Sequence, residues 1–200
     1  MNLLDHVLLG ARDLEATVSR LRRELGLGAV PGGSPAPGVI NAVVPLEPPL
    51  YLELVTATDA GASDAAARLA AATAAGDRLF TWAIEPDDIG ARAASLGIEP
   101  MSGGGDTGRW RLLGEVEQDL PFFIEYDVAR PGRVEGWRRT YAEAAHECAP
   151  GRVTYLEVGG DESGVRQWVG DVDVQLRMVG GEPRLAAMGI ATDQGEIVLR

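Results

Sequence analysis

The hydrophobic positions along the chain change period several times, which predicts alternating strands and helices. Residues 3–10 form a mostly apolar run, and apolar residues from Leu14 to Leu25 then recur at the spacing of one helical face. Asp13 is the expected N-cap of this helix and Gly26 its expected end. Further strands are predicted around residues 27–30, 39–46 and 50–56. The chain up to residue 60 therefore predicts the order β-α-β-β-β.

The same order is predicted again after an alanine-rich stretch. Ser63 is the expected N-cap of a helix over residues 64–75, which would connect the two units. The repeat has a consistent register, because Asp13-Leu14 corresponds to Asp88-Ile89 and Leu52-Glu53 corresponds to Ile124-Glu125. The elements predicted for the second unit are a strand over residues 79–85, a helix over 87–96 and strands over 98–101, 109–113 and 121–127.

A third, shorter unit is predicted at the end of the chain, after a helix over residues 134–147. Its elements are a strand over 152–158, a helix over 162–169 and strands near 174–179, 184–191 and 196–199. The expected organisation is a first module at residues 1–60, a helical connector at 61–78, a second module at 79–130, a helical connector at 131–151 and the third module at 152–200.

Short motifs in the first two units carry a family resemblance. They are Leu4-Asp5-His6-Val7-Leu8, Asp13-Leu14, Asn41-Ala42, Tyr51-Leu52-Glu53-Leu54-Val55 and Leu120-Pro121-Phe122-Phe123-Ile124. With this module order, the chain resembles the glyoxalase-like proteins of the vicinal oxygen chelate superfamily. The resemblance implies an α+β fold of repeated βαβββ modules, two of them paired into a half-open barrel around a small-molecule pocket, with helices outside. The third module would pack beside the pair or mediate dimerisation.

The resemblance also implies metal ligands on the first and last strands of the paired modules, at His6, Glu53, Thr81 and Glu125. The residues themselves give a physical reason, because a carboxylate within an apolar strand needs a metal, a cation or a water-filled cavity. His6, Glu53 and Glu125 together would suit a divalent ion such as Zn, Mn, Ni, Fe or Mg. Threonine is a poor ligand, however, and a structural histidine with two solvent-facing glutamates is the alternative.

Three other residues are candidates for simpler roles. Asn41 is expected to hydrogen-bond a substrate or a ligand residue, with a structural turn role as the alternative. Arg111 would either clamp a substrate carboxylate, hold Glu125, or face solvent. Cys148 follows His146 at a spacing that separates their side chains on a helix, so a structural thiol is expected rather than a nucleophile. The glycine-rich segment 102–108 lacks a Gly-Lys-Ser/Thr ending, so a hairpin or lid loop is expected there.

Composition narrows the classes of partner and compartment. The chain has 200 residues, 46% of them hydrophobic, which suffices for a core. A net charge of -12 argues against nucleic acid. The basic residues are all arginine, which excludes Schiff-base lysine chemistry. No secretion signal or membrane span is recognisable, so a cytoplasmic protein without a membrane partner is expected, and an unpaired sheet edge favours a homodimer.

Three functional hypotheses follow from these residues. The first is a metal-dependent lyase, isomerase or hydrolase acting on a small oxygenated metabolite, with His6 and Glu53 as ligands and Glu125 as ligand or general base. The second is a metal-free protein of the same fold that binds a small molecule such as a drug or toxin, which Thr81 favours. The third is an interaction protein whose site has decayed.

Overall fold

The computed structural model describes residues 1–105, 108–114 and 120–200. Its first unit has the predicted order of elements. Asp13 accepts a hydrogen bond from the Ala16 N–H at 3.0 Å and starts α1, and Gly26 ends this helix with a φ of 68°. The elements are β1 (Leu3–Gly10), α1 (Leu14–Leu25), β2 (Val30–Pro31), β3 (Val39–Pro45) and β4 (Tyr51–Ala57).

The second unit repeats this order after helix α2 (Asp64–Ala72), which Ser63 caps. Asp88 caps the helix of the second unit by accepting from two backbone N–H groups, and Gly97 ends it. The hairpin expected at the glycine-rich segment is formed by two antiparallel strands, and its residues 106–107 lie outside the described residues. The elements are β5 (Arg78–Glu85), α3 (Ile89–Leu96), β6 (Met101–Gly105), β7 (Gly108–Leu113) and β8 (Phe122–Tyr126).

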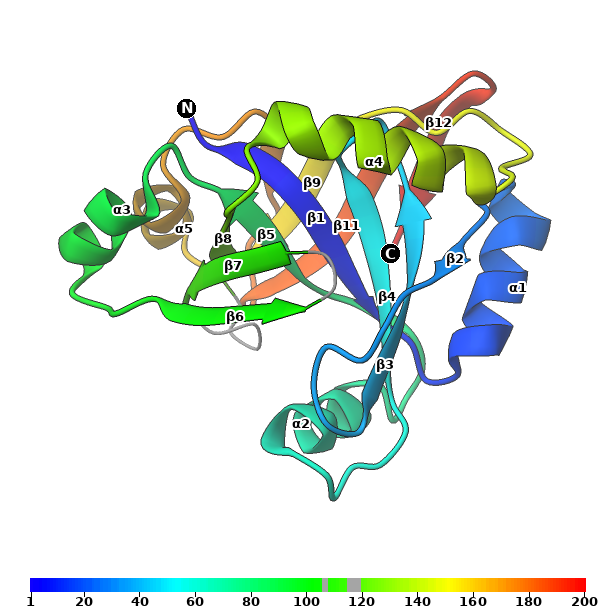
Figure 1. Ribbon diagram of the computed structural model, residues 1–200, viewed down its shortest axis with the longest axis horizontal. Coiled ribbons are helices and arrows are strands. Elements are labelled where there is room, and N and C mark those ends of the chain that lie inside the picture. The colour runs from blue at the N-terminus through cyan, green and yellow to red at the C-terminus, as the bar shows by residue number, and fades with distance from the viewer. Residues whose placement is uncertain (106–107, 115–119) are drawn as a thin grey trace.

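Strands β1 and β5 join the two units into one curled sheet (Figure 1). They pair antiparallel, while the first strand of each unit pairs parallel with the last strand of the same unit, β1 with β4 and β5 with β8. Over the described residues the sheet has eight strands in the order β2-β3-β4-β1-β5-β8-β7-β6. This arrangement confirms the predicted α+β fold with two modules paired into a half-open barrel.

The third unit has the predicted element order but a different strand order. Its elements are β9 (Val153–Gly159), α5 (Glu162–Val169), β10 (Gln175–Met178), β11 (Arg184–Thr192) and β12 (Gly195–Leu199). They form a separate sheet in the order β10-β9-β11-β12. Here the strand after the helix, β10, pairs parallel with β9, whereas β2 and β6 lie at the far edges of their units. The same sequence of elements therefore folds with two topologies in one chain.

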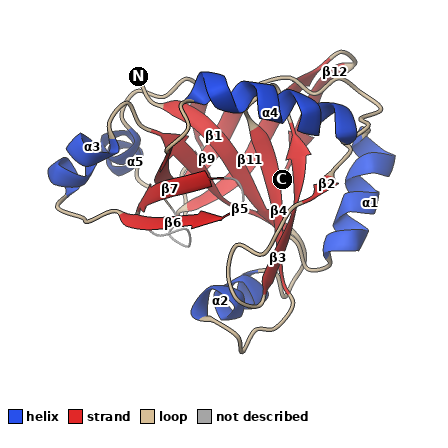
Figure 2. Cartoon of the chain, in the orientation of Figure 1, coloured by secondary structure: helices blue, strands red, loops and turns tan. Residues whose placement is uncertain are grey.

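The two faces of the large sheet have separate cores. One cluster of buried residues joins Trp82 and Phe123 of the large sheet to Leu156 and Met188 of the small sheet, and also includes residues of α1 and α3. We call this the outer face. The opposite, inner face carries a second cluster, which includes Leu8, Val55, Ala83, Phe122 and Ile124 together with Ala66 and Leu69 of α2. Figure 2 shows the small sheet and the surrounding helices.

Helix α4 (Arg130–Glu143) crosses β1 and β4 (Figure 1) and differs from its predicted range of 134–147. It starts earlier because Pro131 is compatible with a first helical turn, where its missing N–H would have no partner. It ends earlier because Ala145 adopts a positive φ of 50°. No residue of α4 is fully buried, and no helix in the described part of the chain is long and apolar enough to cross a membrane.

Candidate functional site

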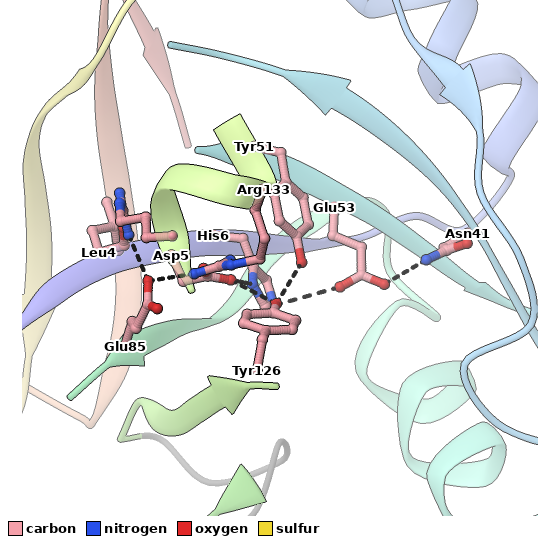
Figure 3. Close-up of polar contacts among 10 residues, drawn as sticks. Leu4, Asp5, His6, Asn41, Tyr51, Glu53, Glu85, Tyr126 and Arg133 are labelled. Atoms are coloured by element: carbon pink, nitrogen blue, oxygen red, sulfur yellow. Dashed lines mark hydrogen bonds and ion pairs between the residues drawn. The ribbon is translucent and has the colours of Figure 1, made fainter. Parts of the chain in front are cut away.

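A β-bulge in β1 brings two neighbouring polar residues to the inner face. Leu4 pairs with Ile84 and His6 pairs with Ala83, so Asp5 is an extra residue without a partner on β5. The bulge shifts the alternation of side chains, because Leu4 belongs to the outer core and Leu8 to the inner core. As a result, Asp5 and His6 both contribute to the polar cluster that Figure 3 shows.

His6 is enclosed by rings and by two carboxylates. Its side chain is 3% exposed, stacks on Tyr51 with a centroid distance of 4.6 Å, and meets Phe122 edge-on. Nδ1 lies 2.8 Å from Oδ2 of Asp5, and Nε2 lies 3.6 Å from Oε2 of Glu53. The imidazole therefore has one carboxylate in hydrogen-bond contact and a second just beyond it (Figure 3).

Glu53 is held from its other side by Asn41. The Asn41 side-chain amide donates to Oε1 of Glu53 at 2.6 Å, and its oxygen accepts from the Gly33 N–H at 2.5 Å. Strand pairing positions this contact, because Glu53 lies opposite Val43 and Asn41 lies opposite Val55 on the adjacent strands β3 and β4. The carboxylate keeps a fixed orientation, with its Oε2 directed toward His6, and the side chain is 13% exposed.

Helix α4 adds two arginines that sequence reasoning missed. Arg133 contacts Oδ1 of Asp5 at 3.0 Å and Oε2 of Glu85 at 2.5 Å, and its guanidinium lies 4.0 Å from the centre of the Tyr126 ring. Arg130 contacts Glu85 at 2.9 Å and donates to the Leu4 carbonyl. The sequence did carry a signal for these two residues, because they are three positions apart in a helix without an apolar stripe.

Two tyrosines complete the hydrogen bonding around Asp5. The Tyr126 hydroxyl donates to Oδ2 of Asp5 at 2.9 Å and lies 3.5 Å from the Tyr51 hydroxyl. Burial and the neighbouring carboxylates raise the pKa of both phenols. Tyr126 therefore stays a donor, and Tyr51 is fixed further by stacking on Trp137 of α4 at 4.4 Å.

The charge on Asp5 decides which nitrogen of His6 carries a proton. Burial alone would raise the pKa of the Asp5 carboxyl, but the hydrogen bond and charge of His6 and the charge of Arg133 outweigh it, so the pKa is lowered. An ionised carboxylate can only accept, so Nδ1 of His6 must be the donor. Nε2 is then the nitrogen that faces Glu53.

Comparison with known protein families identifies the family of this chain. A sequence model of the glyoxalase-like domain matches residues 4–169. This chain belongs to the glyoxalase-like domain family. The match confirms the resemblance that the strand motifs carry, and most of the described site lies on strands β1 to β8 and helix α4 of the matched region.

Several solved structures are similar to this chain over part or most of its length. A hypothetical protein from Staphylococcus aureus has a TM-score of 0.67 at 13% identity and covers 92% of this chain and 88% of its own. Methylmalonyl-CoA epimerase from Streptomyces coelicolor has a TM-score of 0.46 at 21% identity, covering 60% of this chain and 93% of its own. The epimerase from Mycobacterium tuberculosis has the same TM-score at 19% identity, covering 63% and 87%. A comparison with curated proteins found no match.

In this glyoxalase-like protein Glu125 is not brought to His6 and Glu53. Ile124 belongs to the inner core and Phe123 to the outer core, so alternation directs Glu125 to the outer side. Its carboxylate instead pairs with Arg111, which donates through Nε at 2.9 Å. The sequence motif aligned Glu125 with Glu53, but the inner-facing residues of β8 are one position away, and a one-residue slip exchanges the faces.

Thr81 does lie on the inner face, where it is fully buried opposite Leu8. Its hydroxyl donates to the Leu120 carbonyl at 3.3 Å.

Trp82 is buried on the outer face. Cys148 is buried against the Leu25 carbonyl at 3.4 Å, and burial raises the pKa of its thiol.

The donor set does not fit a metal centre. His6 and Glu53 approach each other, but Thr81 is committed to a backbone carbonyl and Glu125 to an arginine on the other side. Among the residues that the structure describes, no group of three or more His, Cys, Asp or Glu side chains is placed to hold a metal ion. Two ligands fall short of the three protein ligands usual at catalytic zinc.

Proposed function

We propose that this glyoxalase-like protein binds a small, uncharged, hydroxyl-bearing molecule at His6 and Glu53 without a metal ion. The observation that carries the proposal is the pair of atoms facing each other at 3.6 Å, Nε2 of His6 and Oε2 of Glu53. With Nδ1 donating to Asp5, Nε2 of His6 and Oε2 of Glu53 are the polar atoms of the pair that remain for a ligand. A ligand hydroxyl donating to Glu53 would satisfy this arrangement.

The charge around the pair favours an uncharged ligand over an oxyanion. Three carboxylates, those of Asp5, Glu53 and Glu85, lie in the polar cluster around His6. The two arginines of this cluster, Arg130 and Arg133, are already paired with Glu85 and Asp5. A ligand carboxylate would therefore meet Glu53 without a free cation beside it. Neutral hydroxycarbonyl compounds combine the required donor with a carbonyl oxygen.

A second candidate function is metal-free proton transfer at a carbon next to a carbonyl, the chemistry of an isomerase or lyase. The orientation of His6 by Asp5 favours it, because a carboxylate on Nδ1 fixes the imidazole with Nε2 directed toward Glu53. Glu53, held by Asn41, would take the proton from carbon, and His6 would donate to the carbonyl oxygen. A metal-dependent lyase or hydrolase would need ligands beyond His6 and Glu53.

The binding proposal is tested with hydroxyacetone as the probe and acetone as its matched compound without the hydroxyl. Saturation-transfer NMR should detect hydroxyacetone bound to the wild type and binding about tenfold weaker in Glu53→Gln, as expected for one charge-assisted hydrogen bond. Glu125→Gln is the matched control and should bind like the wild type. Equal binding of acetone, or an equal loss in Glu125→Gln, contradicts the proposal.

Two further measurements separate the alternatives. In heavy water, proton transfer predicts protein-catalysed exchange of the hydroxyacetone C–H groups that disappears in Glu53→Gln and persists in Glu125→Gln; without exchange, binding alone stands. Elemental analysis of protein purified without a metal-affinity tag tests the metal. A near-stoichiometric divalent ion that is lost in a folded His6→Ala variant would overturn the metal-free proposal. A homodimer remains a separate prediction for sedimentation analysis.

A further inference from the structure

A groove of about 760 Å³ lies beside helix α4, and neither His6 nor Glu53 lines it. Its walls come from α4, the turn between β3 and β4 that contains Pro48 and Pro49, the start of β9 and the segment before β10. Apolar side chains line much of it, namely Leu4, Leu50, Val134, Val153 and Val174. A groove of this size accommodates a small organic molecule rather than a few waters.

Three arginines also line the groove, namely Arg130, Arg138 and Arg152. Arg152 is exposed, and its guanidinium has no partner among the residues that the structure describes. Arg138 pairs only with Glu135 on the same exposed helix surface at 3.2 Å, a contact that contributes little. Arg130 is committed to Glu85, so Arg138 and Arg152 are the guanidinium groups available to a ligand.

Two acidic residues lie on the same lining and offset part of this charge. Asp173 accepts the Leu4 backbone N–H at 2.6 Å and so has a structural role, whereas Glu47 is exposed. Neither forms an ion pair with a groove arginine in the described part of the chain. The groove thus combines apolar walls with two guanidinium groups that can receive an anion.

We infer that this groove binds an amphipathic anion, a molecule with an apolar chain and a terminal carboxylate or phosphate. Arginine binds both head groups with paired N–H donors, and the apolar walls would cover the chain. The site goes beyond the proposed function, because it uses none of His6, Asn41 or Glu53 and takes a ligand of opposite electrostatic preference. The two sites use different residues of helix α4: Arg133 and Trp137 contact the polar cluster, whereas Val134 and Arg138 line the groove.

Decanoate is the probe for this inference, decyl phosphate tests the second head group, and decanol is the uncharged match. Isothermal titration below the micelle-forming concentration should show saturable binding of one or both anions and at least tenfold weaker binding of decanol. The double variant Arg138→Gln/Arg152→Gln should bind the anion at least tenfold more weakly. Arg139→Gln removes an exposed charge from the same helix outside the groove and should bind like the wild type.

The controls make the outcomes distinct. Decanol binding as tightly as the anions, equal loss in Arg139→Gln, or no saturable binding would each overturn the inference. Glu53→Gln should leave decanoate binding unchanged, so the test of the groove and the test of the metal-free site at His6 and Glu53 can fail independently of each other. Circular dichroism of each variant establishes that it is folded.

Discussion

Replacing Arg133 by methionine should destabilise the protein strongly. Asp5 is completely buried and the Arg133 side chain is only 9% exposed, so water cannot replace the lost guanidinium without opening the packing of α4 on the sheet. Methionine keeps much of the side-chain length and volume but no charge. The variant therefore leaves the carboxylates of Asp5 and Glu85 with one cation fewer in a poorly hydrated environment.

The magnitude follows from what remains around Asp5. Removing one partner of a buried ion pair costs about 3–5 kcal/mol, because the other charge stays buried. Asp5 keeps its contacts with His6 and Tyr126, which favours the lower end, about 3 kcal/mol. For a chain of this length, with about 2–4 °C per kcal/mol, the melting temperature should fall by about 6–12 °C.

Urea unfolding at neutral pH, followed by circular dichroism, measures this loss. Arg139→Met is the matched control, since Arg139 is exposed on the same helix, and it should change the unfolding free energy by less than about 0.5 kcal/mol. The double variant Asp5→Asn/Arg133→Met should lose less than the sum of the single variants, because the buried negative charge is gone. Strict additivity, or Arg133→Met within about 1 kcal/mol of the wild type, would refute the assignment of a buried ion pair.

Three further perturbations test other parts of the structure. A Cβ at Gly28 would lie 1.9 Å from a backbone carbonyl oxygen, so Gly28→Ala should cost about 1–3 kcal/mol in urea unfolding. A Cβ at Gly32 would lie 2.0 Å from Oδ1 of Asn41, so Gly32→Ala should displace this side chain and weaken hydroxyacetone binding, and Asn41→Ala should do the same. Burial lowers the pKa of His146 below 6.5, so the unfolded chain binds this proton more readily. Stability should fall as pH drops below about 6.5, and His146→Gln should reduce that slope in urea unfolding.

Local chemistry made most elements predictable. Asp13, Ser63 and Asp88 each precede a helical pattern and accept backbone N–H groups in the structure, and glycines end two of these helices. Such caps act within a few residues, so they are readable without knowledge of the fold. The start of α4 carries no side-chain cap, and its predicted boundary was therefore wrong by a helical turn.

The topology of the third unit and the face of Glu125 depend on non-local pairing. Nothing within residues 153–199 distinguishes β10 pairing with β9 from a far-edge position such as that of β2. Likewise, Glu125 shares the sequence context of Glu53, but the strand register directs it outward. A motif match identifies a strand, whereas the face of each side chain depends on how that strand pairs.

Asp5 and helix α4 show what a sequence reading could still have recovered. An aspartate in a largely apolar strand requires a cation or donors if it is buried, and Asp5 at the bulge in β1 is completely buried. Helix α4 has no continuous apolar stripe, so hydrophobic burial contributes less than usual to holding it on the sheet. A polar helix with arginines at three-residue spacing can supply a cation, and a strand with a buried aspartate requires one. The ion pair between Arg133 and Asp5 meets both requirements. The polar helix and the aspartate in the strand therefore together predict a contact that neither predicts alone.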